Sequence, residues 1–501
     1  MSDNGVLIGF SDHPEELLLN RANRHGLVAG ATGTGKTITL QVLAQGLSDA
    51  GVPVFAADVK GDLSGISCAG APNEKMLARA AGMNLQLHPD AAPTVFWDLF
   101  GQAGHPIRAT VSEMGPLLIA RMLELNDVQE GVLTVVFRAA DDEGLLLLDL
   151  KDLQAALGHA ADNAKELSAK YGNISPATIA TIQRGLLVLE NQGGTNLFGE
   201  PALRLSDLMR TDSSGRGYVN LLAADKLIAS PRLYATFLLW LLSELFEELP
   251  EVGDPDRPKL VFFFDEAHLL FRDAPKPLLE KVEQVVRLIR SKGVGIYFIT
   301  QNPADIPETV LGQLGNRIQH ALRAYTPVEQ RGLRAAADSF RPNPAFDTAE
   351  AIQGLGVGEA LVSVLDEKGA PTVVQKTLVR PPNSRMGPAT PPERQALMAS
   401  SPVKGLYDEA EDRESAYEML QQKAAPPPTP DEPEPRGGPW AGDEASGRPA
   451  PQARASNRQG MAEAFAKSML RTIGSQVGRE LIRGVMGSLV ASSRPTRRRR
   501  Y

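Results

Sequence analysis

The sequence lacks the features that identify several large classes of protein. Its 501 residues contain one cysteine, Cys68, so an intrachain disulfide is excluded and a reducing compartment is favoured. It has no run of about 18 uncharged apolar residues, and we therefore expect no transmembrane segment. The N-terminus has neither a basic stretch nor a long apolar stretch, so we expect no signal peptide and a cytoplasmic location.

A surplus of basic residues is also missing. The chain has 52 Lys and Arg against 60 Asp and Glu, which gives a formal net charge of −8. Nucleic-acid-binding domains are usually basic, so this total does not indicate one, although an acidic total can conceal a basic channel or tail. Hydrophobic residues make up 43% of the chain, enough to bury a core, and the length suits two or three domains.

One sharp change in composition divides the chain. Residues 424–457 hold nine of the 37 prolines and almost no aliphatic side chains, which predicts a disordered linker. A helical pattern follows and ends in an arginine-rich tail. We place the linker at 421–459 and the amphipathic helix with its tail at 460–501.

Short apolar runs alternate with helical patterns before the linker. Runs that are apolar at nearly every position are typical of strands buried on both faces. Residues 278–292 carry a helical apolar stripe that Gly293 is placed to end. The alternation predicts an α/β fold with a mostly parallel sheet, in which a mostly helical insertion at 107–215 separates two parts of one core, 1–106 and 216–420. The expected strands are 26–30, 52–58, 218–222, 259–265, 294–300, 318–324 and 359–365.

A glycine-rich loop follows the first of these strands. Residues 30–37 satisfy the pattern G-x-x-x-x-G-K-[ST] between an apolar strand and a segment suited to a helix. Glycine lets backbone N–H groups converge on phosphates, and the start of the next helix adds positive charge. We expect Lys36 to reach the β- and γ-phosphates of ATP and Thr37 to ligate Mg²⁺. The residues expected to bind the nucleotide are Gly30, Ala31, Thr32, Gly33, Thr34, Gly35, Lys36 and Thr37.

Two carboxylates, Asp265 and Glu266, follow the apolar run that ends at residue 264. Asp265 is expected to hold Mg²⁺ and Glu266 to act as general base for an attacking water, while the alternative is a strand that simply ends in a charged turn. His25 and His268 adjoin these motifs. No second His or Cys stands at metal spacing from either, so we expect each to be structural or to support a residue that contacts the ligand.

Polar side chains also end two further strands. Gln301 can orient the water or bond the γ-phosphate because its amide both donates and accepts, and the alternative is a loop-capping glutamine. Asp58 is either a polar contact beside the Mg²⁺ or the attacking water, or the anchor of a turn around Gly61. Because ligands bind outside the carboxyl ends of parallel strands, we expect all of these strand ends to meet at one edge of the sheet.

Phosphoryl transfer also gains from an arginine, which a neighbouring subunit often supplies. Arg287 and Arg290 lie in a predicted helix, where surface ion pairing and the helix dipole account for them. Arg317 immediately precedes the strand expected at 318–324, and Arg323 lies near its end. Arg317 is our candidate for the arginine supplied in trans.

The segments "NRHGLVAGATGTGKT", "FAADVKGDLSG", "VFFFDEAHLLF", "IRSKGVGIYFITQNPADIP" and "VLGQLGNRIQHALRAYTP" form a recognisable set. Together they resemble the bacterial HerA-like ATPases of the HerA–FtsK superfamily, and within it the YjgR-type subgroup. The resemblance covers about residues 5–400. It implies a RecA-like P-loop core, hexameric rings, and ATP sites at subunit interfaces that an arginine of the neighbour completes.

The resemblance also assigns residues. Lys36 and Thr37 match the Walker A positions, Asp265 and Glu266 match the Walker B pair, and Gln301 matches the glutamine after the sensor strand. One departure is the N-terminal β-barrel of the HerA proteins. Only about 25 residues precede the glycine-rich loop here, too few for a barrel. Partner contacts made through that barrel are therefore not implied, and a nuclease or other partner stays unidentified.

The motifs thus indicate a Mg²⁺-dependent ATPase, and the resemblance implies that it forms a homo-oligomeric ring that moves duplex DNA. Two alternatives stay open. One is a ring ATPase that remodels polypeptides. The other is a nucleotide-switched, membrane-associated scaffold that places its basic tail on anionic lipid.

The tail yields a first prediction. Five arginines, Arg494 and Arg497–Arg500, close the chain, either as a solvated run or as a tethered binder of DNA phosphates. Each neutralised phosphate contributes about 0.9 to the salt slope on duplex DNA, so five contribute up to about 4–5. Truncation after residue 423 should leave basal ATP turnover intact, weaken DNA binding and flatten its salt dependence. DNA affinity measured at several salt concentrations checks this, and an unchanged slope would exclude the tail from DNA binding.

Overall fold

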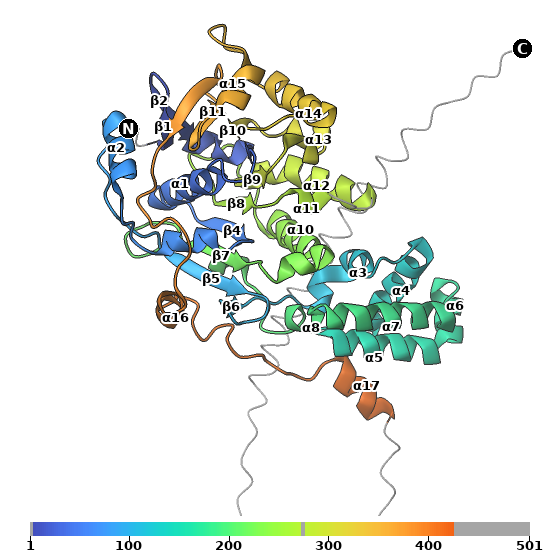
Figure 1. Ribbon diagram of the computed structural model, residues 1–501. Coiled ribbons are helices and arrows are strands. Elements are labelled where there is room, and N and C mark those ends of the chain that lie inside the picture. The colour runs from blue at the N-terminus through green and yellow to red at the C-terminus, as the bar shows by residue number, and fades with distance from the viewer. Residues whose placement is uncertain (1–3, 272–275, 425–501) are drawn as a thin grey trace, which may run out of the picture. The chain divides into compact units, whose positions relative to one another are not determined.

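A sheet of twelve strands forms the centre of the part of the chain that the structure describes (Figure 1). The structure is a computed structural model that describes residues 4–271 and 276–424. The linker and C-terminal helix expected beyond residue 424 lie outside the described residues. Helix α17 (Ala416–Ala424) occupies the first positions that the sequence assigned to the linker, so the helical structure ends later than expected.

The strands pair in the order β2-β1-β12-β11-β10-β3-β9-β8-β4-β7-β5-β6. All pairings from β10 through to β6 are parallel, whereas β10, β11, β12, β1 and β2 pair antiparallel in succession. The mostly parallel α/β sheet expected from the sequence is therefore confirmed. The strands are β1 Gly5–Phe10, β2 Pro14–Leu18, β3 Gly26–Ala29, β4 Val54–Asp58, β5 Thr94–Asp98, β6 His105–Pro106, β7 Val219–Ala223, β8 Leu260–Phe264, β9 Val294–Thr300, β10 Asn316–Gln319, β11 Glu359–Ser363 and β12 Gln375–Val379.

Each of the seven strands expected from the sequence overlaps a strand of the structure, but β10 ends at Gln319, well before the expected end at residue 324. The sequence analysis missed β1, β2, β5, β6 and β12. In β2 and β12 buried positions alternate with more exposed ones. Such strands lack the continuous apolar run that marks a strand covered on both faces.

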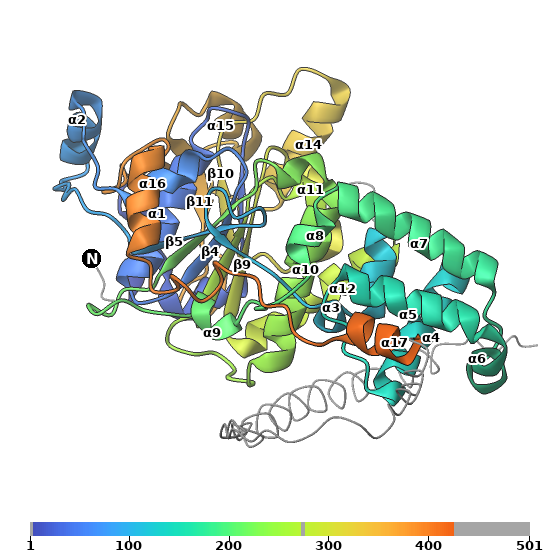
Figure 2. The same cartoon turned by 90° about the horizontal axis from the view of Figure 1, so that it is seen from below.

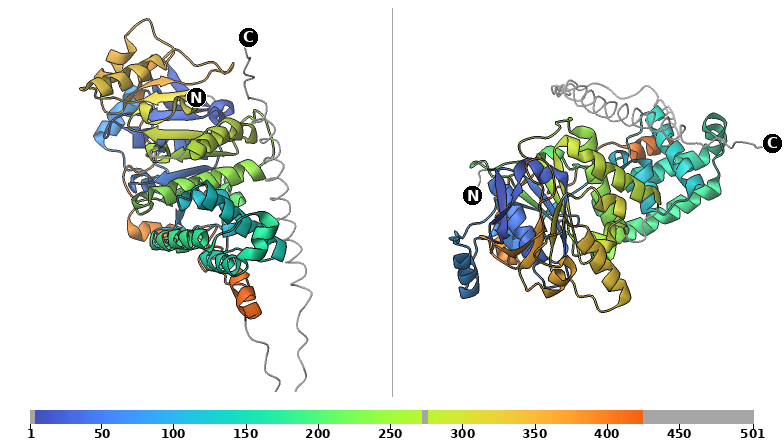
Figure 3. Two further views of the ribbon diagram at one scale, coloured as in Figure 1. Left: turned by 90° about the vertical axis from the view of Figure 1, so that its right-hand side faces the viewer. Right: turned by 90° about the horizontal axis from the view of Figure 1, so that it is seen from above.

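Both faces of the parallel part of the sheet are buried. On β8, Phe262 and Phe264 face a core shared with α10 and α12, and Val261 and Phe263 face a second core shared with α1. Successive side chains of a strand point to opposite faces, so an uninterrupted apolar run supplies both cores. Figure 3 shows the resulting layers, with α1 and α10 on opposite sides of the strands.

The helices follow the expected periodicity. Helix α12 covers the segment expected at 278–292 and ends before a short 3-10 helix and Gly293, whose φ of 79° suits a helix terminus. The helices are α1 Lys36–Asp49, α2 Glu74–Gly82, α3 Val111–Met122, α4 Asp127–Glu143, α5 Leu150–Asp162, α6 Ala164–Tyr171, α7 Pro176–Asn191, α8 Gly194–Leu197, α9 Leu205–Leu208, α10 Pro231–Glu248, α11 His268–Phe271, α12 Lys276–Ile289, α13 Glu308–Leu311, α14 Pro327–Asp338, α15 Thr348–Gly354, α16 Pro391–Ala399 and α17.

Helices α3 to α9 occupy the range in which the sequence predicts a mostly helical insertion, and its standing as a separate part of the fold stays a prediction. Reciprocal capping boxes begin three of its helices, because Thr110, Asn126 and Asp149 each accept a hydrogen bond from the backbone three residues on. Helices α5 and α7 lie side by side and extend beyond α10 (Figure 2). Their apolar sides join the core that covers one face of the sheet.

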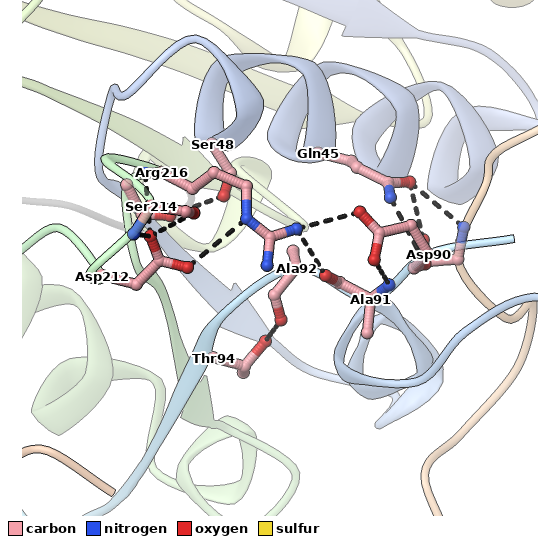
Figure 4. Close-up of polar contacts among 11 residues, drawn as sticks. Gln45, Ser48, Asp90, Ala91, Ala92, Thr94, Asp212, Ser214 and Arg216 are labelled. Carbon is pink, nitrogen blue, oxygen red and sulfur yellow. Dashed lines mark hydrogen bonds and ion pairs between the residues drawn. The ribbon is translucent and has the colours of Figure 1, made fainter. Parts of the chain in front are cut away.

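A set of polar contacts holds the sheet edge at the amino ends of β5 and β7 (Figure 4). Arg216 Nη1 donates to Asp90 Oδ2 at 2.9 Å, and Arg216 Nε donates to Asp212 Oδ2 at 3.4 Å. Ser48, near the end of α1, donates to the carbonyl of Gly217 at 2.5 Å. Helix α1 starts at the glycine-rich loop, so these contacts fix its far end against the strands.

The last described residues before Ala424 contact strand β6 and helices α9 and α5. His105 Nδ1 lies 2.6 Å from Asp408 Oδ1, and Tyr407 donates to Asp207 Oδ2 at 2.5 Å. Helix α17 then packs against α5. Within residues 4–271 and 276–424, no helix combines the length and apolarity needed to span a membrane. Helix α10, which is long and rich in apolar residues, is largely buried in the core.

Candidate functional site

Four neighbouring parallel strands end at one edge of the sheet, and each carries polar residues there. In spatial order they are β3, β9, β8 and β4. The glycine-rich loop follows β3, Gln301 follows β9, Asp265 and Glu266 follow β8, and Asp58 ends β4. The structure thus brings these residues to the common edge that the sequence indicated, while their chemical roles stay predictions.

The glycine-rich loop needs glycine for its backbone shape. Gly30 has φ 154° and Gly35 has φ 119°, both in the region that favours glycine. A Cβ on Gly30 would lie 2.5 Å from His320 Cβ and 3.0 Å from Thr34 Oγ1. Helix α1 begins at Lys36, and no side chain caps its N-terminus. Its first backbone N–H groups are therefore placed to donate to an anion.

The Lys36 ammonium lies within the loop. It donates to the carbonyls of Gly30 at 2.6 Å and Ala31 at 3.1 Å. Burial lowers its pKa, and the negative charge of Glu266 partly opposes that change. Thr37 follows in the first turn of α1. The loop, the lysine and the open helix terminus together fit a polyphosphate.

Asp265 and Glu266 form a sharp turn after β8. The Asp265 Oδ1 atom accepts a hydrogen bond from the Glu266 N–H at 2.9 Å, and Tyr234 donates to the Asp265 carbonyl at 3.3 Å. Glu266 has φ 50°, a left-handed conformation that is uncommon for a residue with a Cβ. Such conformations persist where the surrounding structure enforces them, often at active sites. Burial, followed by the charge of Glu266, raises the pKa of Asp265 to about 6.

The Glu266 carboxylate is buried and has three side-chain partners. Lys60 Nζ lies 2.9 Å from Oε1, Gln301 Nε2 lies 3.3 Å from Oε2, and His268 Nδ1 lies 3.4 Å from Oε2. Burial raises the pKa of Glu266, but the hydrogen bond and charge of Lys60, the hydrogen bond of Gln301 and the charge of His268 together outweigh it, so the pKa lies below the ordinary value. The carboxylate is therefore ionised at neutral pH and able to accept a proton.

Gln301 joins the glycine-rich loop to this carboxylate. Its Oε1 accepts a hydrogen bond from Thr32 Oγ1 at 3.3 Å while its Nε2 donates to Glu266. One amide thus contacts the phosphate-binding loop and the candidate base. The loop-capping alternative is not needed to explain these contacts.

Asp58 has a different environment. Burial raises its pKa to about 6, although the backbone N–H groups of Leu63 and Gly61 donate to its carboxylate and oppose the change. These contacts support the turn-anchoring alternative that the sequence left open. The turn that Asp58 anchors carries Lys60, so Asp58 helps to place the partner of Glu266.

Sequence analysis missed His320, which supports the loop from β10. Its Nδ1 lies 2.9 Å from the Glu359 carbonyl, and its Nε2 lies 2.8 Å from Thr39 Oγ1 in α1. Facing a carbonyl, Nδ1 must carry the proton, so Nε2 accepts from the Thr39 hydroxyl. Burial lowers the pKa of His320 to about 4. No sequence signal pointed to it, because His320 falls inside the strand expected at 318–324, whereas in the structure it follows the end of β10 at Gln319.

The two histidines noted in the sequence differ. His25 is buried, with Nε2 2.7 Å from the Val286 carbonyl and Nδ1 accepting the Ile296 N–H at 3.0 Å. Its contacts are those of a structural residue. His268 contacts Glu266 and, with Phe271, Gln301 and Asp305, lines a cavity of about 440 Å³ beside the catalytic candidates.

Arg317 lies at the amino end of β10 and is held within its own chain. Its guanidinium donates to the carbonyls of Leu311 at 2.9 Å, Leu314 at 3.1 Å and Ser339 at 2.8 Å. Arg323 is exposed and follows the carboxyl end of β10, where Ala321 accepts from the glycine-rich loop. The role of Arg317 in a neighbouring site stays a prediction, and its three carbonyl contacts give it a structural role as well.

The residues at this edge also suit Mg²⁺. In the described part of the chain no group of three or more His, Cys, Asp or Glu side chains is arranged to hold a metal ion. Mg²⁺ in phosphate sites needs only one or two protein oxygens, because phosphate and water supply the rest. The Asp265 carboxylate after β8 and the Thr37 hydroxyl in the first turn of α1 are oxygen ligands of the required kind, and only β9 separates β8 from β3, the strand that leads to α1.

Comparison with known proteins places the chain in one group. The family model described as Helicase HerA-like C-terminal matches residues 6–494. The DNA double-strand break repair helicase HerA of Sulfolobus acidocaldarius is 22% identical over 362 residues, which cover 72% of this chain and 66% of that protein. HerA of Saccharolobus solfataricus is 23% identical over 380 residues, with coverage of 72% and 65%. The chain thus spans just under two thirds of the length of these relatives.

Solved structures with a weak similarity include two further proteins. The plasmid coupling protein TrwB in complex with the GTP analogue GDPNP has 15% identity and a TM-score of 0.49, covering 77% of this chain and 91% of its own. VirB4 of Thermoanaerobacter pseudethanolicus has 15% identity and a TM-score of 0.48, with coverage of 78% and 99%.

The buried histidines yield a prediction about stability. Burial lowers the pKa of His25 from 6.5 to about 4, so below pH 6.5 the unfolded chain binds a proton that the folded chain refuses. The folded state therefore loses stability as the pH falls from 6.5 to 4, by about 3 kcal/mol at most from this residue. Replacing His25 by Gln should lower the melting temperature at pH 7 and make its further fall toward pH 4 shallower.

The readout is the difference in melting temperature between wild type and His25→Gln at each pH. Asp58 and Asp265 act in the opposite direction, because a raised carboxyl pKa favours the folded state as protons bind. They are common to both proteins and cancel in the difference. A difference that stays constant from pH 7 to pH 4 would contradict the prediction.

Proposed function

Because the chain belongs to the family described as Helicase HerA-like C-terminal, we propose that it is a Mg²⁺-dependent ATPase that forms a ring and moves along duplex DNA. ATP binding by a P-loop is the basis of this family, and the glycine-rich loop has the matching geometry. The observation that carries the hydrolytic role is the contact of Gln301 with both Thr32 and Glu266. It joins a phosphate-binding loop to an ionised carboxylate.

The proposed chemistry divides among the residues of the strand ends. Glu266 accepts a proton from water as the water oxygen bonds to the γ-phosphorus and the bond to the β–γ bridging oxygen breaks. Lys36 stabilises the charge that develops on the phosphate oxygens, and Gln301 orients the water. Thr37 and Asp265 hold Mg²⁺, which neutralises phosphate charge when bound. An arginine from a neighbouring subunit completes the site.

Duplex DNA as the moved substrate rests on the names of the HerA relatives. The described residues carry no separate argument for DNA over polypeptide, so the alternatives from the sequence are kept as outcomes of the experiment. Turnover that duplex DNA stimulates, with a strong dependence on salt, supports translocation. Turnover indifferent to DNA, combined with co-sedimentation on anionic vesicles, supports the scaffold instead.

Hydrolysis itself is predicted to depend on two residues in different ways. Lys36→Ala should abolish ATP turnover, and Glu266→Gln should bind ATP while losing about 10²–10³ in rate. Steady-state turnover and nucleotide binding by calorimetry measure the two effects separately. Glu409→Gln, an exposed carboxylate outside the site, is the matched control and should behave as wild type. A Glu266→Gln rate within about threefold of wild type would refute the base assignment.

The ring is predicted to share its sites between subunits. Mixing Glu266→Gln subunits with Arg317→Ala subunits creates some interfaces that hold both intact groups, so activity should exceed that of either variant alone. Mixing with Arg287→Ala, an exposed position on α12, should give only the average.

Arg317 binds three backbone carbonyls, so the melting temperature of its variant must be recorded first. If Arg317→Ala fails to fold, Arg323→Ala takes its place in the mixture. A native mass that contains only active monomers would end the proposal of a shared site.

A further inference from the structure

Lys60 lies in the turn that follows β4, and its side chain reaches the candidate base Glu266. Its ammonium lies 2.9 Å from Glu266 Oε1, and the two residues follow the ends of the neighbouring strands β4 and β8. The Lys60 side chain is 48% exposed, whereas that of Glu266 is 7% exposed. One partner of the ion pair is therefore fixed in the protein, and the other has solvent on one side.

A contribution to the stability of the fold does not account well for the ion pair between Lys60 and Glu266. An ion pair with one half-exposed lysine contributes little, because water screens it and the long side chain must be ordered. Glu266 also has donors from Gln301 and His268, so its oxygens are not without other partners. The turn beneath is already anchored, because Asp58 accepts hydrogen bonds from the backbone of Gly61 and Leu63.

The geometry allows the ammonium to change partner while the backbone stays in place. Lys60 has a flexible stem of four carbons, and the neighbouring Gly61, at φ 76°, has open space around its Cα. The anchored turn keeps the Lys60 backbone at the strand edge. A short rotation of the side chain therefore carries the charge from Glu266 to any stronger anion at the same edge.

The anion expected there is the γ-phosphate. Lys36 lies close enough to Lys60 for their charges to repel, and Glu266 acts on both. Two ammonium groups and a carboxylate thus share the space beside the glycine-rich loop. ATP places a highly charged γ-phosphate at this point and ADP does not, so only ATP can compete with Glu266 for Lys60.

We propose that Lys60 is a second phosphate-binding lysine, which pairs with Glu266 as seen here and transfers to the γ-phosphate of bound ATP. The transfer removes a cation from the carboxylate that is to accept the proton of water. Lys60 thereby makes the base available only when there is a phosphate to attack. This inference rests on the proposed ATPase function and adds a residue that distinguishes ATP from ADP.

The experiment measures nucleotide affinity in the full chain. Calorimetry gives Kd for ADP and for an ATP analogue with a non-hydrolysable β–γ bridge, in wild type and in Lys60→Met. Met keeps the length of the side chain and removes the charge. Lys60→Arg keeps the charge, and Lys75→Met, an exposed lysine on α2, is the matched control.

Lys60→Met should bind the ATP analogue about 10- to 100-fold more weakly, the usual range for one charge-assisted hydrogen bond, and should bind ADP nearly as wild type does. Lys60→Arg should retain most of the preference for the analogue, and Lys75→Met all of it. The same loss should occur when Lys60→Met is placed in a Glu266→Gln chain, because the lost contact is to phosphate.

Three results would overturn the inference. They are an unchanged ratio of the two Kd values, equal weakening of ADP and analogue, and a loss that disappears in the Glu266→Gln chain. The retained ADP affinity shows that the variant is folded, and Lys60→Gln supplies the same ratio if the Met variant does not fold. A wild-type chain that binds neither nucleotide would refute the proposed function instead.

Discussion

The hydrogen bonds of β3 to β9 on one side and to β10 on the other fix the glycine-rich loop, and the rest of the site depends on them. They continue past the strand, because Gly30 donates to the Thr300 carbonyl and Ala31 donates to the Ala321 carbonyl. The loop therefore cannot move without its neighbours. A Cβ on Gly30 has no room, so the same close approach dictates the residue type.

Parallel pairing then decides which polar groups meet. Strands β9, β8 and β4 lie in order on one side of β3, and each delivers its last residues to the same edge. Two cores cover the faces of these strands, so polar residues are tolerated only where a strand ends. At this edge the Glu266 carboxylate therefore meets the positive charge of Lys60 and the neutral amide of Gln301.

Much of this arrangement could be predicted from the sequence, and the limits have physical causes. The strands β3 and β8, which are buried on both faces, stand out in the sequence as apolar runs. The glycine-rich loop and the carboxylates of Asp265 and Glu266 follow them directly, so their meeting at the carboxyl ends of the strands was predictable. Strands β2 and β12 alternate buried with more exposed positions and were missed for that reason, whereas β1 and β5 are buried runs that the sequence analysis also missed. The partner of Glu266 was also missed, because Lys60 is 206 residues away and only the strand order brings them together. For Arg317, the sequence gives proximity to a strand but not the carbonyls that hold its guanidinium.

The negative net charge of the chain does not prevent Lys36 and Lys60 from binding phosphate, because net charge and local charges act over different distances. Surface charges separated by more than about 10 Å are largely screened at physiological salt, whereas groups at a partly buried edge are not. Lys36 and Lys60 therefore respond mainly to Asp265, Glu266 and a bound phosphate rather than to the net charge. Recognition of phosphate is set locally by the strand ends. Any attraction of DNA must come from surfaces or segments with their own basic charge, of which the arginine-rich end is the clearest in the sequence.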